Sequence, residues 1–223
     1  KDRMCPELNE KDFQLNQRQQ LVEQFNFRFN LAKKNKKNGC VFLNKNPHLC
    51  NKLRLVNVLF PDARYVWIKR DMIKVAASIK RLFELSYTKH HSFHYWPHNQ
   101  RNVAARCFEF FSKKEDFPKD LDASRVFPGG NIEYLAEYWY ENNNAVKGFF
   151  KSMPSHRTIC VDQNALIHNT AHEMQRIFSL LNVSCGKLEF NQFNIDKSRN
   201  DDWATLLNET ERKILAELKQ SIE

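Results

Sequence analysis

The stretch Tyr65–Phe83, with the sequence YVWIKRDMIKVAASIKRLF, decides the fold of this chain. Its first residues, Tyr65–Ile68, form a short run of aromatic and aliphatic side chains, which is typical of a buried strand. From Asp71 onward the apolar residues recur every three or four positions, which is the period of a helix with one buried face. The stretch therefore predicts a strand that leads directly into an amphipathic helix.

Two further apolar runs, Cys40–Leu43 and Thr158–Val161, also predict buried strands. Helical periodicity predicts helices near residues 8–34, 48–59, 132–150 and 174–181, and one from about residue 208. Strands that are apolar throughout and alternate with helices indicate an α/β fold with a parallel sheet covered by helices. Residues 86–130 are less regular, and we interpret them as a loop and helical insertion with one short helix near 101–112.

The composition limits the classes of function. The chain has 223 residues with 35 basic and 26 acidic side chains, a net charge of +9, which favours an anionic partner without choosing one. The six cysteines and the histidines lack zinc-site spacing. Cys40 and Cys160 fall in the predicted strands and should be buried there. Two sequons begin at Asn182 and Asn208, and they would matter only in a secretory compartment.

Cations follow two of the predicted strands. Lys45 comes after the strand at 40–43, and Arg70 follows the strand at 65–68. Ligands of parallel sheets bind at the carboxyl ends of strands, so these two side chains predict an anion site. Ser78 stands seven residues after Asp71 and returns to the same helix face two turns later. The alternatives are cations that only face water, and a serine that bonds to its own helix.

The order of these residues resembles a known family. Asn44-Lys45-Asn46-Pro47, then Leu59-Phe60-Pro61-Asp62-Ala63-Arg64, a strand, Arg70 and Ser78 resemble the core of the sulfotransferases that use 3′-phosphoadenosine 5′-phosphosulfate (PAPS). The chain is most similar to the Golgi-type and bacterial branches, including the tyrosylprotein sulfotransferases. The resemblance implies a P-loop-NTPase-like parallel sheet flanked by helices, with PAPS as donor, 3′-phosphoadenosine 5′-phosphate (PAP) as product, and no metal.

The resemblance also implies roles for single residues. Arg70 and Ser78 would hold the 3′-phosphate of the nucleotide, and Lys45 would contact the sulfuryl group in transfer. The segment around Lys197 and Arg199 resembles the C-terminal loop that closes over the nucleotide, so these two are candidates for a phosphate clamp. Solvated loop charges are the alternative for both.

A helix and a strand further along the chain also resemble the family, but the strand ends in different residues. The helix with Trp139 and Asn143 resembles a tryptophan-containing helix of the family, and Asn143 is either an ordinary core asparagine or a support behind the active site. The strand at 158–162 ends in Val161-Asp162, whereas the family has Tyr-Glu there. The adenine contact that this tyrosine makes in the family is therefore in doubt.

One family feature is not found in the sequence. The Gly- and Thr-rich loop that binds the phosphosulfate should precede these motifs, and residues 1–40 contain nothing similar. We therefore expect residues 1–223 to form a single sulfotransferase-like domain that is the C-terminal portion of a longer chain. The alternative is a non-catalytic relative that binds anionic ligands.

The resemblance implies a broad class of acceptor and favours one cellular compartment. The expected partner is a hydroxyl or amine on a glycan, peptide or small molecule, and nucleic acid is not expected because no recognition motif is present. The insertion at 86–130 would set acceptor specificity, unless its histidines and aromatic residues simply form a surface loop. The family branch favours the Golgi lumen with a membrane anchor outside this chain. The cytoplasm is expected if the source is bacterial or viral.

Overall fold

A computed structural model describes residues 9, 11, 14–33, 41–85, 93–95, 109–111, 115, 119, 126–127, 131–184 and 201–222. The chain divides into two compact units, one of which covers Glu7–Ala63 and the other Arg64–Glu223. The larger unit contains Arg70 and Ser78, and the smaller unit contains Lys45.

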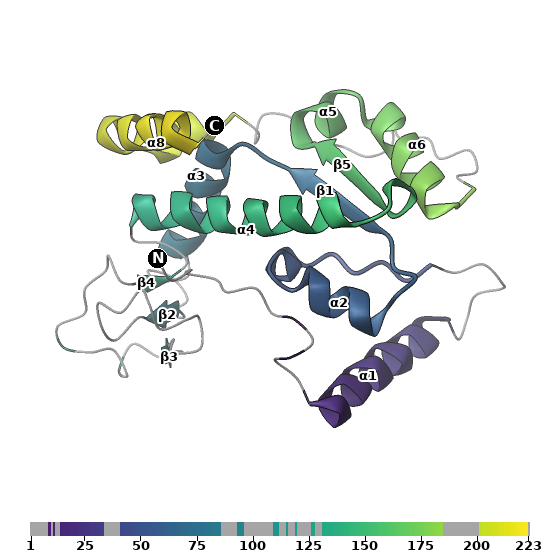
Figure 1. Cartoon of the computed structure of the whole chain (residues 1–223). Helices are drawn as coiled ribbons and strands as arrows, with labels where there is room; N and C mark the ends of the chain where they lie inside the picture. The colour runs from purple at the N-terminus through teal and green to yellow at the C-terminus, as the bar shows by residue number, and fades with distance from the viewer. Residues whose placement is uncertain are drawn as a thin grey trace. The chain divides into compact units, whose positions relative to one another are not determined.

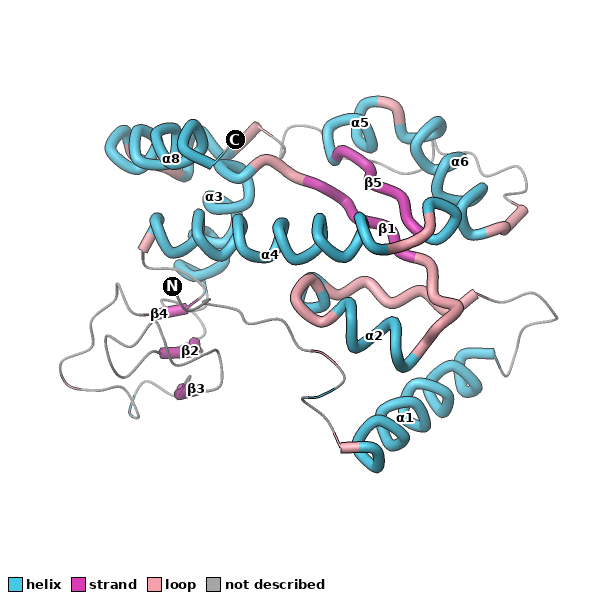
Figure 2. The backbone as a smooth tube through the Cα atoms, in the orientation of Figure 1, coloured by secondary structure: helices cyan, strands magenta, loops and turns pink. Residues whose placement is uncertain are grey.

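A parallel pair of strands forms the centre of the larger unit (Figures 1 and 2). Strand β1 (Tyr65–Lys69) pairs with β5 (Thr158–Asp162) in a register that runs from Tyr65 opposite Thr158 to Lys69 opposite Asp162. Helices flank this two-stranded sheet. The predicted strands at 65–68 and 158–161 and the α/β fold with a P-loop-like parallel sheet are therefore confirmed.

Two long helices each begin at a residue whose side chain caps the first turn. Helix α3 (Met72–Glu84) begins after Asp71, whose carboxylate accepts hydrogen bonds from the backbone N–H groups of residues 73 and 74. Helix α4 (Ile132–Ser152) begins after Asn131, whose side chain caps residues 133 and 134 in the same way. Such caps satisfy N–H groups that have no acceptor inside the helix. Both predicted helices are confirmed.

The core of the larger unit lies where α3 meets α4 and the C-terminal helices α7 (Trp203–Leu206) and α8 (Glu209–Ile222). Small side chains on α3 allow these helices to approach closely, and larger side chains fill the space between them. The buried members of this cluster are Met72, Ala76, Ala77, Ile132, Leu135, Ala136, Leu207 and Leu215. The helix predicted from about residue 208 is thereby confirmed, whereas α7 was not predicted.

Aromatic contacts join α4 to the sheet. The Tyr65 and Phe149 rings lie 4.9 Å apart, and the Trp67 and Phe150 rings lie 5.6 Å apart, both in edge-to-face geometry. Such pairs add about 0.5–1.5 kcal/mol beyond the area that they bury. Tyr65 and Trp67 alternate along β1, so they lie on one face of the sheet, and α4 covers that face.

Helices α5 (Gln163–His168) and α6 (Thr170–Leu181) follow β5 directly and pack against it (Figure 1). The carboxylate of Asp162 caps α5 by accepting from residues 164 and 165. Asn182 ends α6 in the left-handed conformation, with φ of 53°, which asparagine tolerates better than most residues. The helix predicted at 174–181 is confirmed, although it begins earlier, at Thr170.

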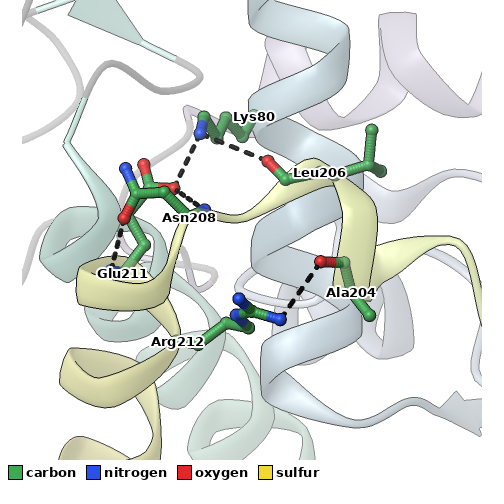
Figure 3. A network of polar contacts seen from close by, with 6 residues as sticks. All are labelled: Lys80, Ala204, Leu206, Asn208, Glu211 and Arg212. Atoms are coloured by element: carbon green, nitrogen blue, oxygen red, sulfur yellow. Dashed lines mark hydrogen bonds and ion pairs between the residues drawn. The ribbon is translucent and has the colours of Figure 1, made fainter.

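Ion pairs attach the C-terminal segment to α3. Lys80 Nζ donates to the Leu206 carbonyl at 3.2 Å and pairs with Glu211 at 2.7 Å; Figure 3 shows both contacts as dashed lines. Asn208 and Glu211 bond reciprocally, side chain to backbone N–H, which is a capping box at the start of α8. Two more pairs complete the attachment: Lys74 with Asp201 at 3.3 Å, and Lys219 with Asp71 at 2.7 Å.

The smaller unit holds α1 (Leu15–Lys33), a 3-10 turn at Pro47–Leu49, and α2 (Leu53–Leu59). The strand predicted at 40–43 is wrong for Val41–Leu43, which form no strand, and Cys40 lies outside the described residues. The ring of Phe42 lies 6.1 Å from that of Phe25 on α1. A strand needs a neighbour for its backbone groups, and no described residue of this unit forms one. Instead of pairing as a strand, this apolar run contacts α1 through the Phe42 ring.

Three short strands form an antiparallel sheet within the predicted insertion. They are β2 (Phe93–Tyr95), β3 (Glu109–Phe111) and β4 (Val126–Phe127), in the order β3-β2-β4. The short helix predicted near 101–112 is wrong at Glu109–Phe111, because this aromatic run pairs with β2. The rest of that predicted helix lies outside the described residues.

Helix boundaries differ from the prediction in the smaller unit. The helix expected from residue 8 begins at Leu15, and the helix expected from residue 48 begins at Leu53 after the 3-10 turn. Helix ends are difficult to predict where no side chain caps them, and Lys52, which precedes α2, makes no side-chain cap.

Across the described residues, no helix combines the length and apolar character needed to cross a membrane.

Replacing Leu215 by Ala should lower the free energy of unfolding by about 2–5 kcal/mol, because this fully buried side chain would leave a cavity. Urea denaturation followed by circular dichroism would measure the change. The matched control is Lys213→Ala, an exposed position on the same helix, which should change stability by less than about 0.5 kcal/mol. Equal effects of the two substitutions would contradict the packing of α8 described above.

Replacing Lys219 by Met should lower the free energy of unfolding at pH 7 by about 1 kcal/mol, since the pair with Asp71 is partly exposed. The folded-state pKa of Asp71 is lowered, so the pair stabilises the fold at neutral pH and loses its effect as the pH falls through that pKa. The difference from wild type should therefore shrink in urea titrations done below about pH 3.9. Lys213→Met is the control, and a difference that does not depend on pH would contradict the ion pair.

Candidate functional site

The backbone of Arg70 is held at the carboxyl end of β1. Arg70 stands between the last residue of β1 and Asp71, the cap of α3. Its carbonyl accepts a hydrogen bond from Nε1 of Trp139 on α4 at 3.0 Å. This bond crosses from one element to another and uses the polar end of a half-buried indole. The strand end is therefore fixed by α4 as well as by the helix that follows.

The guanidinium of Arg70 has binding capacity that the described residues do not use. The side chain is half-buried, and its Nε is buried without a hydrogen-bond acceptor. Burial lowers the pKa of Arg70, and the nearby Asp71 opposes that effect. Arginine stays charged in proteins, so the desolvated cation favours an anion that would supply the missing acceptor.

Asp71 does not supply that acceptor, because its carboxylate is engaged elsewhere. One oxygen caps α3, and the other accepts from Lys219 Nζ at 2.7 Å. Burial alone would raise the pKa of Asp71, but the bonds from Lys219 and from the backbone of Lys74 and Ile73 outweigh burial and lower it. Asp71 is thus an ionised and neutralised carboxylate, which leaves Arg70 available to an anion.

Ser78 is exposed on α3. It lies seven residues beyond Asp71, which corresponds to about 10 Å along the helix axis. An anion that contacts both Arg70 and Ser78 would therefore need the long arginine side chain to extend along α3. A shared role of these two residues remains a prediction.

The other predicted site residues lie outside the larger unit or outside the described residues. Lys45 is exposed and belongs to the smaller unit. Lys197 and Arg199 lie outside the described residues. The roles expected of these three residues remain predictions. Within the part of the chain that is described, no three His, Cys, Asp or Glu side chains gather as a metal site would require.

Gln163 was not singled out from the sequence. It directly follows β5 and begins α5, and its side-chain oxygen Oε1 is buried without a hydrogen-bond donor among the described residues. A glutamine after an apolar strand is an ordinary sequence feature, so no pattern in the sequence points to this buried atom. Only the packing around the strand end reveals it.

Two asparagines of α4 donate hydrogen bonds to carbonyl groups of their own helix. Nδ2 of Asn143 donates to the Trp139 carbonyl at 2.7 Å, and Nδ2 of Asn142 donates to the Tyr138 carbonyl at 2.8 Å. Asn142 is the more buried of the two, with 8% of its surface exposed. These bonds agree with the interpretation of Asn143 as an ordinary core asparagine.

Cys160 corrects another expectation. It lies in β5 as predicted, but it is exposed rather than buried. Partial desolvation raises the pKa of its thiol and that of Cys50, so neither is a preformed thiolate nucleophile.

A shallow, open hollow of about 460 Å³ lies between β5 and α6, away from Arg70. Thr158 and Ile159 at the amino end of β5 line it, together with His172 and Arg176 of α6. Arg176 pairs with the buried Glu173, so its charge is used within the helix, and His172 Nδ1 lies 3.1 Å from the same carboxylate. Ligands of parallel sheets bind at the opposite, carboxyl end. The end that holds Arg70 and Gln163 is therefore the stronger candidate site.

Comparison with known proteins identifies the family. The family model described as "Sulfotransferase family" matches residues 3–127, which is more than half of the chain and includes Lys45, Arg70 and Ser78. No curated protein and no solved structure matched the chain. The matched residues contain the strand end and helix whose geometry is described above. This chain belongs to the sulfotransferase family.

Proposed function

We propose that the chain transfers a sulfuryl group from PAPS to a hydroxyl or amine acceptor, and that Arg70 and Ser78 hold the 3′-phosphate of the nucleotide. Family membership supports sulfuryl transfer as the reaction. The observation that carries the choice of site is the buried Nε of Arg70, which has no acceptor among the described residues. A phosphate oxygen is an acceptor of the required charge.

The surroundings of Arg70 favour a phosphate. A guanidinium forms paired, charge-assisted bonds with phosphate oxygens. The N–H groups at the start of α3 add positive potential at the same strand end. Lys219 neutralises Asp71, so the nearest carboxylate repels the phosphate less. Lys197 and Arg199 would add further cations to the nucleotide if their segment closes over it.

Lys45 is the proposed catalytic residue. Sulfuryl transfer needs little covalent chemistry from the protein, so positioning and electrostatics supply most of the rate. When bound, the donor supplies the sulfuryl group, and negative charge develops on the oxygen that links the sulfate to the 5′-phosphate. The ammonium of Lys45 would stabilise that charge. No metal has a role in this proposal.

The branch of the family, the type of acceptor, the domain organisation and the compartment are also proposals. The order of motifs supports a place near the Golgi-type and bacterial branches, with a glycan, peptide or small molecule as acceptor. It also supports a single sulfotransferase-like domain over residues 1–223. The Golgi lumen is the proposed compartment, and the cytoplasm is the alternative for a bacterial or viral source.

Replacing Arg70 by Met should weaken the binding of PAP by about 10-fold to 100-fold, because hydrogen bonds to a charged group are worth about 1.5–3 kcal/mol. Binding of 5′-AMP, which lacks the 3′-phosphate, should change little. Isothermal titration calorimetry with both nucleotides would measure the preference. Arg81→Met, at an exposed position of α3, is the control. A folded wild-type chain that binds both nucleotides equally would contradict the proposed phosphate site.

Replacing Lys45 by Ala should lower turnover by about 10²–10³-fold, which is typical for the loss of one preorganised donor at developing charge. The affinity for PAP should change little. Turnover would be followed as PAP formed from PAPS, with a phenol, an acidic tyrosine peptide and an unsulfated glycan as acceptors.

Lys147→Ala, at an exposed position of α4, is the matched control. Equal losses of turnover and PAP affinity would make Lys45 a binding residue rather than a catalytic one. Binding of PAP with no turnover on any acceptor would favour the non-catalytic alternative.

A further inference from the structure

We propose that Gln163 is a residue of the donor-nucleotide site, and that its side-chain oxygen accepts a hydrogen bond from an O–H or N–H group of the nucleotide. This inference rests on the proposed function, because it concerns the same ligand. It assigns a residue that neither the motif order nor the family match singles out.

The sheet places Gln163 beside Arg70. Strands β1 and β5 are parallel neighbours, and their last paired residues are Lys69 and Asp162. Arg70 and Gln163 are the residues that come directly after this pair. Neighbouring strands lie about 4.8 Å apart, so both residues leave the sheet from adjacent positions on its carboxyl edge. Ligands of parallel sheets bind at this edge.

Both residues carry a buried polar atom without a partner. Among the described residues, the buried side-chain atoms that lack a hydrogen bond are Nε of Arg70 and Oε1 of Gln163. One is a donor and the other an acceptor, and they do not satisfy each other. Leaving a buried polar group unpaired is unfavourable, so native proteins seldom keep one without a role. Two such atoms at adjacent strand ends indicate one ligand that contacts both.

The two atoms specify complementary chemistry. The Arg70 cation favours an anion, whereas the Gln163 oxygen needs a hydrogen-bond donor, which an ionised phosphate oxygen does not supply. A nucleotide provides both, since it combines phosphate with the hydroxyl groups of ribose and the amine of adenine. Of the two residues before Gln163, Val161 is fully buried and apolar, and Asp162 is exposed and caps α5 through its Oδ1. Gln163 is thus the residue at the end of β5 that has a buried acceptor without a donor among the described residues.

The test is the replacement of Gln163 by Met, which keeps the length of the side chain and removes its polar end. The affinity for PAP should fall about 3-fold to 10-fold, the usual range for one hydrogen bond. The melting temperature of the nucleotide-free chain should stay the same or rise, because the unsatisfied oxygen is gone. Calorimetry and thermal unfolding would measure these changes. Gln175→Met, at an exposed position of α6, is the matched control and should change neither.

The outcomes separate this inference from the proposed function. If wild type prefers PAP to 5′-AMP and Gln163→Met binds PAP equally well, the role of Gln163 is overturned and the phosphate site stands. A clear fall in the melting temperature of the free chain would also overturn it, because Gln163 would then stabilise the fold itself. If wild type shows no preference for PAP, the proposed function fails and this inference fails with it.

Discussion

The close packing of helices against α3 is the constraint on which the larger unit depends. Ala76 and Ala77 of α3 are fully buried, and their small size lets α4 and the C-terminal helices approach. Leu135 of α4 and Leu215 of α8 fill the space that the alanines leave. A larger side chain at either alanine would force these helices apart, because protein interiors leave few voids for relaxation.

The same packing positions the candidate site. Helix α4, which packs on α3, carries the indole that bonds to the Arg70 carbonyl. Helix α8 packs on both and carries Lys219, which neutralises Asp71 beside the arginine. The guanidinium therefore stands on a rigid strand end, next to a carboxylate that other groups already hold. Such preorganisation matters for binding, because fewer groups have to be ordered when the ligand arrives.

Local sequence patterns predicted much of the larger unit. The apolar runs gave β1 and β5, and the helical period with Asp71 as cap gave α3, because these signals depend on neighbours in the chain. The same reasoning failed at Val41–Leu43, where an apolar run forms no strand, and at β3, where a strand replaced a predicted helix. Strand formation depends on a partner that is distant in sequence, so a short run cannot decide it alone.

The sequence by itself determined the family, the parallel strand pair and the identity of Arg70 as the cation after β1, since residue order carries all three. Tertiary structure alone decided which polar atoms at that edge lack partners. Nε of Arg70 and Oε1 of Gln163, which have no partner in the described part of the chain, come to adjacent positions because β1 and β5 lie side by side although they are far apart in sequence. Burial removes water from both atoms, and the energy of a polar atom depends on what surrounds it rather than on its neighbours in the chain.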